Sequence, residues 1–173
     1  MRPFSWSGSP NTHMGKIFPL GDDAIENLLQ HALVGRIACC DHGKSDGDGR
    51  PFLVPLAYGY DGEAAYAMSR LGRKIRIMRE QPLVSFEVDE ATAEDRWSSV
   101  IADAVYEEIT DPEEQQRALQ IIAKGGEPPV ASPESIIFRL RMTRKTGRYE
   151  IPDDEAAVLM AMNGDAEGLP PKH

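Results

Sequence analysis

Residues 64–80 read AAYAMSRLGRKIRIMRE and join two kinds of secondary structure across a short basic turn. The part up to Ser69 is a run of small and aromatic residues that is typical of a β-strand. From Leu71 onward, apolar residues recur at helical spacing, and Pro82 follows closely enough to end the helix. This stretch therefore predicts a strand that passes almost directly into a helix over 71–80.

The turn within this stretch gathers groups that bind anions. A helix start offers free backbone N–H groups and the positive end of the helix dipole. Arg73 can present a planar fork to two phosphate oxygens, Lys74 adds a compact charge, and the Ser69 hydroxyl adds a neutral hydrogen bond. The turn predicts a phosphate-monoester site, and the alternative is a basic first turn that only faces solvent.

Short strand patterns dominate the chain on both sides of this turn. They cover residues 36–41, 52–60, 64–69, 83–88, 98–108 and 136–149. A further helix is expected over 111–124, with Asp111 as its N-cap and Pro112 as its first helical residue. Six strands with flanking helices predict a mainly β, α+β fold, built as a barrel or a sandwich.

The length of 173 residues fits one domain of ordinary size. We expect this domain to span 17–151. Residues 1–16 are rich in Pro, Ser and Gly and predict a flexible arm. Residues 152–173 are acidic and predict a tail with a short helix over 156–162, after which order fades.

Two further strand features allow more than one interpretation. Pro55 lies in the middle of the apolar strand 51–60, and proline cannot donate to a sheet ladder. It therefore indicates a sheet edge, a bulge, or a place where a planar ligand lies against the backbone. Trp97 opens the strand over 98–108 and can pack in the core, in a subunit interface, or beside a cofactor.

Composition excludes several classes of function. The formal charge of −9 opposes binding to nucleic acid or to anionic membranes, and no apolar run is long enough to cross a bilayer. Cys39 and Cys40 are neighbours, which makes them poor disulfide partners and favours two thiols in a reducing compartment. The four histidines have no metal-ligand spacing, so no metal site is expected. These features predict a cytoplasmic protein.

The order of these segments resembles that of the pyridoxamine-phosphate-oxidase-like FMN-binding family. The chain is most similar to the branch that contains the nitroimidazole-resistance (Nim) proteins, over residues 20–149. The resemblance implies a six-stranded FMN-binding split β-barrel. It also implies a homodimer that holds one FMN in each of two grooves between the protomers.

The resemblance assigns a set of residues to the FMN site, and it names no catalytic residue. They are Ser69, Arg73 and Lys74 for the phosphate; Val54, Pro55 and Leu56 for the strand along the isoalloxazine ring; Ala67 and Met68 for ring and ribityl contacts; and Trp97 and Ser98 for contacts from the second subunit. Met68 stands where the Nim-like branch commonly carries a histidine. The basic segment 139–148 lacks the Trp of the true pyridoxamine-phosphate oxidases, so vitamin B6 oxidation is not expected.

The resemblance implies an FMN-dependent oxidoreductase that passes electrons from NADH or NADPH to a small acceptor. In such an enzyme the flavin performs the chemistry, and the protein supplies position and electrostatics. One alternative is a flavin-binding dimer without turnover, acting as a store or a sensor. Another is a relative that binds haem or a deazaflavin in place of FMN.

Overall fold

The computed structural model describes residues 15–40 and 50–163, and these form eight strands and four helices. The elements in chain order are β1 (Lys16–Pro19), α1 (Asp22–His31), β2 (Val34–Cys40), β3 (Pro51–Ala57), β4 (Gly59–Tyr60), β5 (Ala64–Arg70), α2 (Arg73–Glu80), β6 (Leu83–Ala93), β7 (Arg96–Glu108), α3 (Pro112–Ile122), β8 (Ser135–Ile151) and α4 (Asp153–Asn163). Within this part of the chain no helix is long and apolar enough to cross a membrane.

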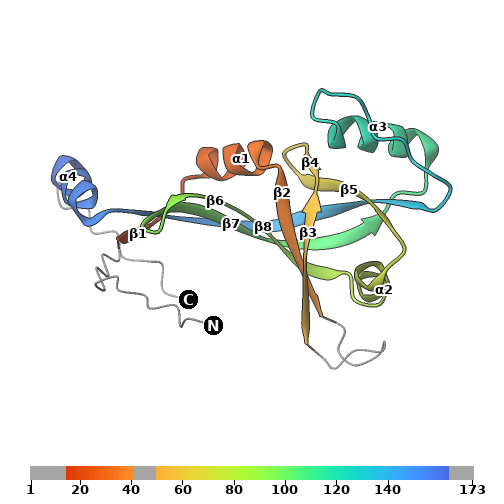
Figure 1. Cartoon of the computed structure of the whole chain (residues 1–173), viewed down its shortest axis with the longest axis horizontal. Helices are drawn as coiled ribbons and strands as arrows, with labels where there is room; N and C mark the ends of the chain where they lie inside the picture. The colour runs from red at the N-terminus through yellow and green to blue at the C-terminus, as the bar shows by residue number, and fades with distance from the viewer. Residues whose placement is uncertain (1–14, 41–49, 164–173) are drawn as a thin grey trace, which may run out of the picture.

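All eight strands belong to one antiparallel sheet (Figure 1). The strand order is β3-β2-β6-β7-β8-β5-β4, and β1 pairs with the far end of β8. The first and last strands of this order, β3 and β4, are separated in sequence only by Tyr58. The sheet must therefore curl until its two edges meet at this residue, and since β3 pairs with β2 alone, the barrel closes without a complete ladder.

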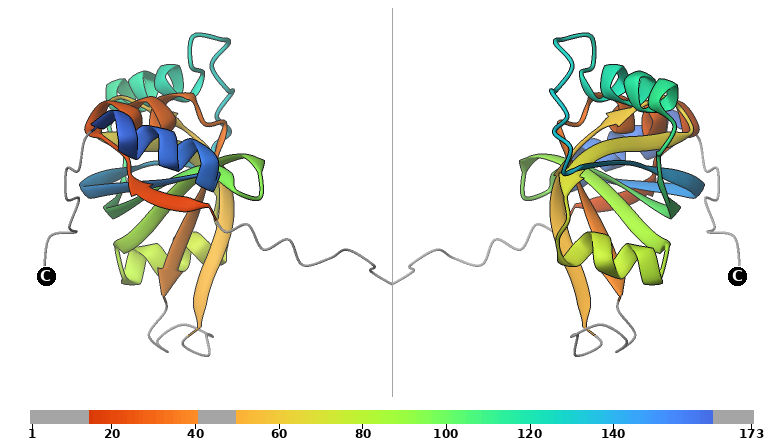
Figure 2. Two further views of the ribbon diagram at one scale, coloured as in Figure 1. Left: turned by 90° about the vertical axis from the view of Figure 1, so that its left-hand side faces the viewer. Right: turned by 90° about the vertical axis from the view of Figure 1, so that its right-hand side faces the viewer.

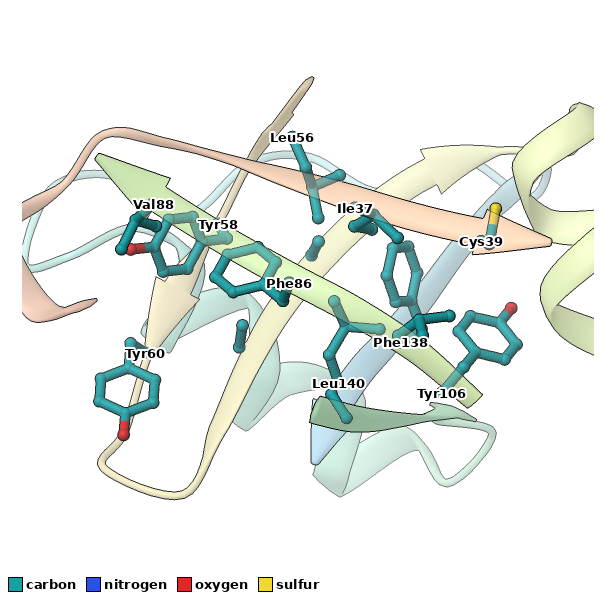
Figure 3. Packing of buried hydrophobic residues seen from close by; sticks show 14 of the residues in the cluster. Ile37, Cys39, Leu56, Tyr58, Tyr60, Phe86, Val88, Tyr106, Phe138 and Leu140 are labelled. Atoms are coloured by element: carbon teal, nitrogen blue, oxygen red, sulfur yellow. The ribbon is translucent and has the colours of Figure 1, made fainter. Parts of the chain in front are cut away.

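The curled sheet encloses a core that contains several aromatic side chains (Figure 3). Tyr58 meets Phe86 edge to face, with ring centroids 4.9 Å apart, and its hydroxyl donates to the Leu29 carbonyl at 2.6 Å. Tyr106 and Phe138 form a second ring pair at 5.2 Å. A smaller group under α3, formed by Ile109, Ala118 and Ile137, is called the second core cluster below. In the end views of Figure 2 the strands fan out around the enclosed space.

The fold class is confirmed, but the predicted number of six strands was wrong. The expected strand over 52–60 divides at Tyr58, where the chain leaves β2 and begins to pair with β5. Gly59 permits this change of partner, because a Cβ there would lie 2.0 Å from the Ile121 carbonyl oxygen of α3. The other additional strand, β1, begins at Lys16 and is too short to show a period of its own.

The predicted helices occur with shifted ends. Asp111 caps α3 through hydrogen bonds from the backbone N–H groups of Glu113 and Glu114, and Pro112 is the first helical residue, as expected. The helix expected over 71–80 begins two residues later, at Arg73. The helix expected over 156–162 is part of the longer α4. Residues 1–14 and 164–173, which include most of the expected arm and the end of the tail, lie outside the described residues.

Candidate functional site

The start of α2 is the predicted anion site. Gly72 is its N-cap, no side chain of the described residues caps this end, and the first turn carries no acidic residue. The first helical hydrogen bond inside the turn is donated by the Arg76 N–H to the Gly72 carbonyl, at 3.1 Å. The N–H groups before Arg76 therefore have no intrahelical acceptor, and they lie at the positive end of the helix dipole.

Two cations at this helix start have no carboxylate partner among residues 15–40 and 50–163. Arg73 is exposed, and its guanidinium carbon lies 4.8 Å from the centroid of the Phe52 ring. Lys74 is half-buried, and burial lowers its pKa. A phosphate bound here would supply the counter-charge that both side chains lack.

The thiol of Cys39 lies near the end of β2 (Figure 3). It is close enough to Arg73 and Lys74 for their charges to lower its pKa. Burial raises its pKa to about 11, and the charges of Arg73 and Lys74 only partly oppose that effect. The thiol is therefore neutral at physiological pH and cannot neutralise either cation.

The other end of α2 is fixed to the sheet by an ion pair. Arg79 donates to both oxygens of Glu108, at 2.6 and 3.1 Å, and the Tyr106 hydroxyl donates to one of them at 2.6 Å. These contacts lower the pKa of Glu108 below its ordinary value, with the hydrogen bond from Arg79 as the main cause. Within the described residues, α2 thus has one arginine whose donors are engaged at its end and another, Arg73, whose donors have no hydrogen-bond acceptor at its start.

β5 leads into α2 and carries three of the predicted site residues. Ala67 is fully buried in the main core, whereas Met68 packs against the second core cluster on the opposite face. The Ser69 hydroxyl donates to the Arg70 carbonyl at 3.0 Å, so in this rotamer its proton is not free for a phosphate. The structure therefore brings Ser69 to the helix start and directs the Met68 side chain toward α3.

β3 carries the other residues expected along the flavin ring. It lies at the end of the strand order, which explains how the sheet accommodates Pro55 without its N–H. Val54 and Leu56 point toward the core, and Pro55 is exposed opposite Arg36 of β2. Phe52 lies on the same strand and the same face as Val54, two residues earlier, so about 7 Å of strand separates the two side chains.

Trp97 lies far from the helix start within one chain. Its indole N–H donates to Glu150, and it pairs with Ala91 of β6. Ser85 of the same strand pairs with Ala38, next to the thiol described above. Ser85 is six positions before Ala91 along the strand, which is about 20 Å. A single chain therefore does not join Trp97 and Ser98 to Arg73 and Lys74.

Ser98 lines an open groove of about 740 Å³ between α1 and the far half of β6. Arg36 and Asp89, which form an ion pair, line the same groove, together with the apolar side chains of Leu28 and Leu33. Ser98 donates to Glu90 at 3.1 Å. In the described part of the chain no three His, Cys, Asp or Glu side chains gather as metal ligands.

Sequence reasoning did not identify Phe52 or Glu108 as parts of this region. Phe52 is twenty-one positions before Arg73, and no local pattern links a strand aromatic to a distant helix start. Glu108 ends β7, where acidic residues commonly face solvent. Both contacts come from the packing of α2 against the curled sheet, which periodicity does not predict.

Comparisons with known proteins agree with this architecture. The family model described as pyridoxamine 5'-phosphate oxidase matches residues 21–149. An uncharacterized protein of Rhizobium meliloti is 30% identical over 131 residues, which cover 66% of this chain and 83% of that protein. A crystal structure of a FAD-binding protein from Mesorhizobium loti is 32% identical, with a TM-score of 0.62, and the match covers 78% of this chain and 99% of the other.

A second solved structure has the same fold at lower identity. It is a candidate 5-nitroimidazole antibiotic resistance protein from Bacteroides thetaiotaomicron, 21% identical with a TM-score of 0.64. The match covers 78% of this chain and 87% of that one. At this identity the likeness supports the fold alone.

Proposed function

The chain belongs to the pyridoxamine 5'-phosphate oxidase family, and from this we propose that it is an FMN-binding oxidoreductase that takes electrons from NADH or NADPH. The observation that carries the proposal is the uncapped start of α2, where Arg73 and Lys74 have no carboxylate partner among the described residues. The terminal phosphate of FMN matches this set of donors in charge and in hydrogen bonding.

The position of β3 supports the same cofactor. Phe52 lies under Arg73, and Val54, Pro55 and Leu56 follow it along the edge strand. Phe52 and Val54 are two residues apart on one face of β3, so about 7 Å of strand separates the ring under Arg73 from the first predicted ring contact. The Mesorhizobium loti protein, which is 32% identical, is named as FAD-binding, and this also favours a flavin.

The residues of the proposed ring site set limits on the chemistry. A bound flavin supplies hydride and electron transfer, and the protein positions it. Pro55 has no N–H, and Met68 has no ionisable group. Neither side chain can donate a proton to an acceptor. We therefore propose an acceptor that takes electrons without general acid catalysis from this wall of the site.

The cofactor itself tests the proposal. Protein purified without added cofactor is expected to show a flavin absorbance spectrum, and mass spectrometry of the material released by denaturation is expected to identify FMN. If the released cofactor is FAD, the chain binds a flavin, and the proposal of FMN is wrong. A Soret band or a released deazaflavin would contradict the proposal and favour the haem- or deazaflavin-binding alternative.

We propose that the protein is a homodimer and that the partner supplies Trp97 and Ser98 to each flavin. Leu53, Leu83 and Ile101 are between 51% and 63% exposed on the neighbouring part of β3, β6 and β7, and a partner subunit would cover this apolar surface. Light scattering is expected to give twice the chain mass of 19.1 kDa. A mass of one chain throughout the micromolar range would contradict the dimer.

We also propose that the protein works in the cytoplasm on a small molecule, without nucleic acid or membrane partners. Cys39 and Cys40 are free thiols, as expected in a reducing compartment. The net charge of −9 would repel nucleic acid and anionic lipid surfaces.

A further inference from the structure

The ring of Phe52 lies under the guanidinium of Arg73, with 4.8 Å between the guanidinium carbon and the ring centroid. The ring is half-buried and packs against the main core beside Val54. Its strand is paired with β2, where Phe52 faces Cys39, and the Cys39 thiol donates to the Phe52 carbonyl at 3.6 Å. The core and the ladder thus fix the ring, and its remaining surface meets the cation.

Arg73 differs from the arginines that form ion pairs in this structure. Each of those arginines forms an ion pair with a carboxylate; they are Arg36, Arg79, Arg96, Arg139, Arg141 and Arg144. A carboxylate fixes a guanidinium but also occupies its donors and neutralises its charge. An aromatic face attracts the cation through the ring quadrupole, and it carries no negative charge that would neutralise the guanidinium. Phe52 therefore restrains Arg73 while it leaves the charge and the donors available.

We propose that Phe52 is a positioning residue that holds the Arg73 guanidinium, with its donors free, at the place where the flavin phosphate binds. This inference rests on the proposed function. It explains how an exposed arginine can be ordered before the phosphate arrives, which reduces the entropy lost on binding. The effect acts only through the phosphate, so it should not alter the binding of a flavin that lacks one.

Phe52→Leu tests the proposal, because leucine keeps an apolar side chain in the core and removes the ring face. The quantity to measure is the dissociation constant of riboflavin divided by that of FMN, each from fluorescence titration of the apoprotein. We expect Phe52→Leu to lower this ratio about 3- to 30-fold, the range of a cation–π contact. Phe52→Tyr keeps a ring face and is expected to leave the ratio unchanged.

Two controls separate this role from a general effect on the pocket. Phe18→Leu makes the same change in a ring that stacks on Tyr149, away from α2, and should not alter the ratio. In an Arg73→Ala background, Phe52→Leu should lower the ratio no further. Phe52→Met provides a second variant that lacks the ring, in case the leucine variant fails to fold.

The outcomes distinguish this inference from the proposed function. A wild-type ratio near one would show that no phosphate is recognised, and it would overturn the site at α2. A high wild-type ratio that Phe52→Leu and Phe52→Met both preserve would overturn the role of Phe52 alone. An equal loss of the ratio with and without Arg73 would also overturn it, because the ring would then act independently of the arginine.

Discussion

Replacing Arg73 and Lys74 together with alanine is expected to release FMN while the fold stays intact. Each charged hydrogen bond contributes about 1.5–3 kcal/mol, so the loss of both cations should weaken binding by about two to four orders of magnitude. The fold should survive because neither side chain has an ion-pair partner within the described residues. The measurement is the FMN dissociation constant, with thermal unfolding as the test of folding.

A charge-matched control uses two arginines of β8. Arg141→Ala with Arg144→Ala removes the same charge from exposed side chains that pair with Glu107 and Asp103. This variant should bind FMN close to the wild-type value, because the removed groups are not at the start of α2. If the Arg73 and Lys74 double variant instead purifies with its full content of bound flavin, the phosphate binds elsewhere and the proposed site is wrong.

NADH or NADPH in excess is expected to remove the absorbance of the oxidised flavin in the absence of air. Hydride transfer requires the nicotinamide to stack on one open face of the ring at near-attack distance, and it requires no general acid. A groove between two protomers can provide that face. Afterwards, quinones or nitroaromatics should restore the absorbance faster than acceptors that must be protonated during transfer, because Pro55 and Met68 supply no proton.

Two comparisons give this experiment a clear result. Free FMN mixed with the same nucleotide measures the reaction without protein, and dithionite shows that the bound flavin can be reduced. If the absorbance persists for hours with either nucleotide while dithionite removes it at once, the bound flavin does not accept hydride from NADH or NADPH. The flavin-binding dimer without turnover would then be the better account.

The sequence predicts the parts of this molecule that depend on local signals. The passage from β5 into α2 is visible because a strand pattern, a glycine and a helical pattern follow one another between Ala64 and Glu80. Asp111 and Pro112 mark the start of α3 for the same reason, since capping depends on neighbouring residues. The family resemblance over 20–149 is confirmed by the family model that matches 21–149.

The parts that sequence reasoning missed depend on contacts between distant segments. The break at Tyr58 exists because the two edges of the curled sheet meet there, and the pattern of residues 52–60 is continuous across it. The direction of the Met68 side chain follows from its register with Ile137 and from the packing of α3. The contact of Phe52 with Arg73 likewise appears only when α2 packs beside β2 and β3.

The pairing of β8 has a consequence for the order in which the chain can fold. This strand, Ser135–Ile151, is the last of the described sheet, yet it pairs with β1, β5 and β7. During synthesis the ribosome releases those three strands before their shared partner. Until residues 135–151 emerge, β1 has no partner strand, β5 can pair only with the two residues of β4, and β7 can pair only with β6. The barrel therefore assembles late. Until then the unpaired apolar strands of the nascent chain are exposed to aggregation with other chains.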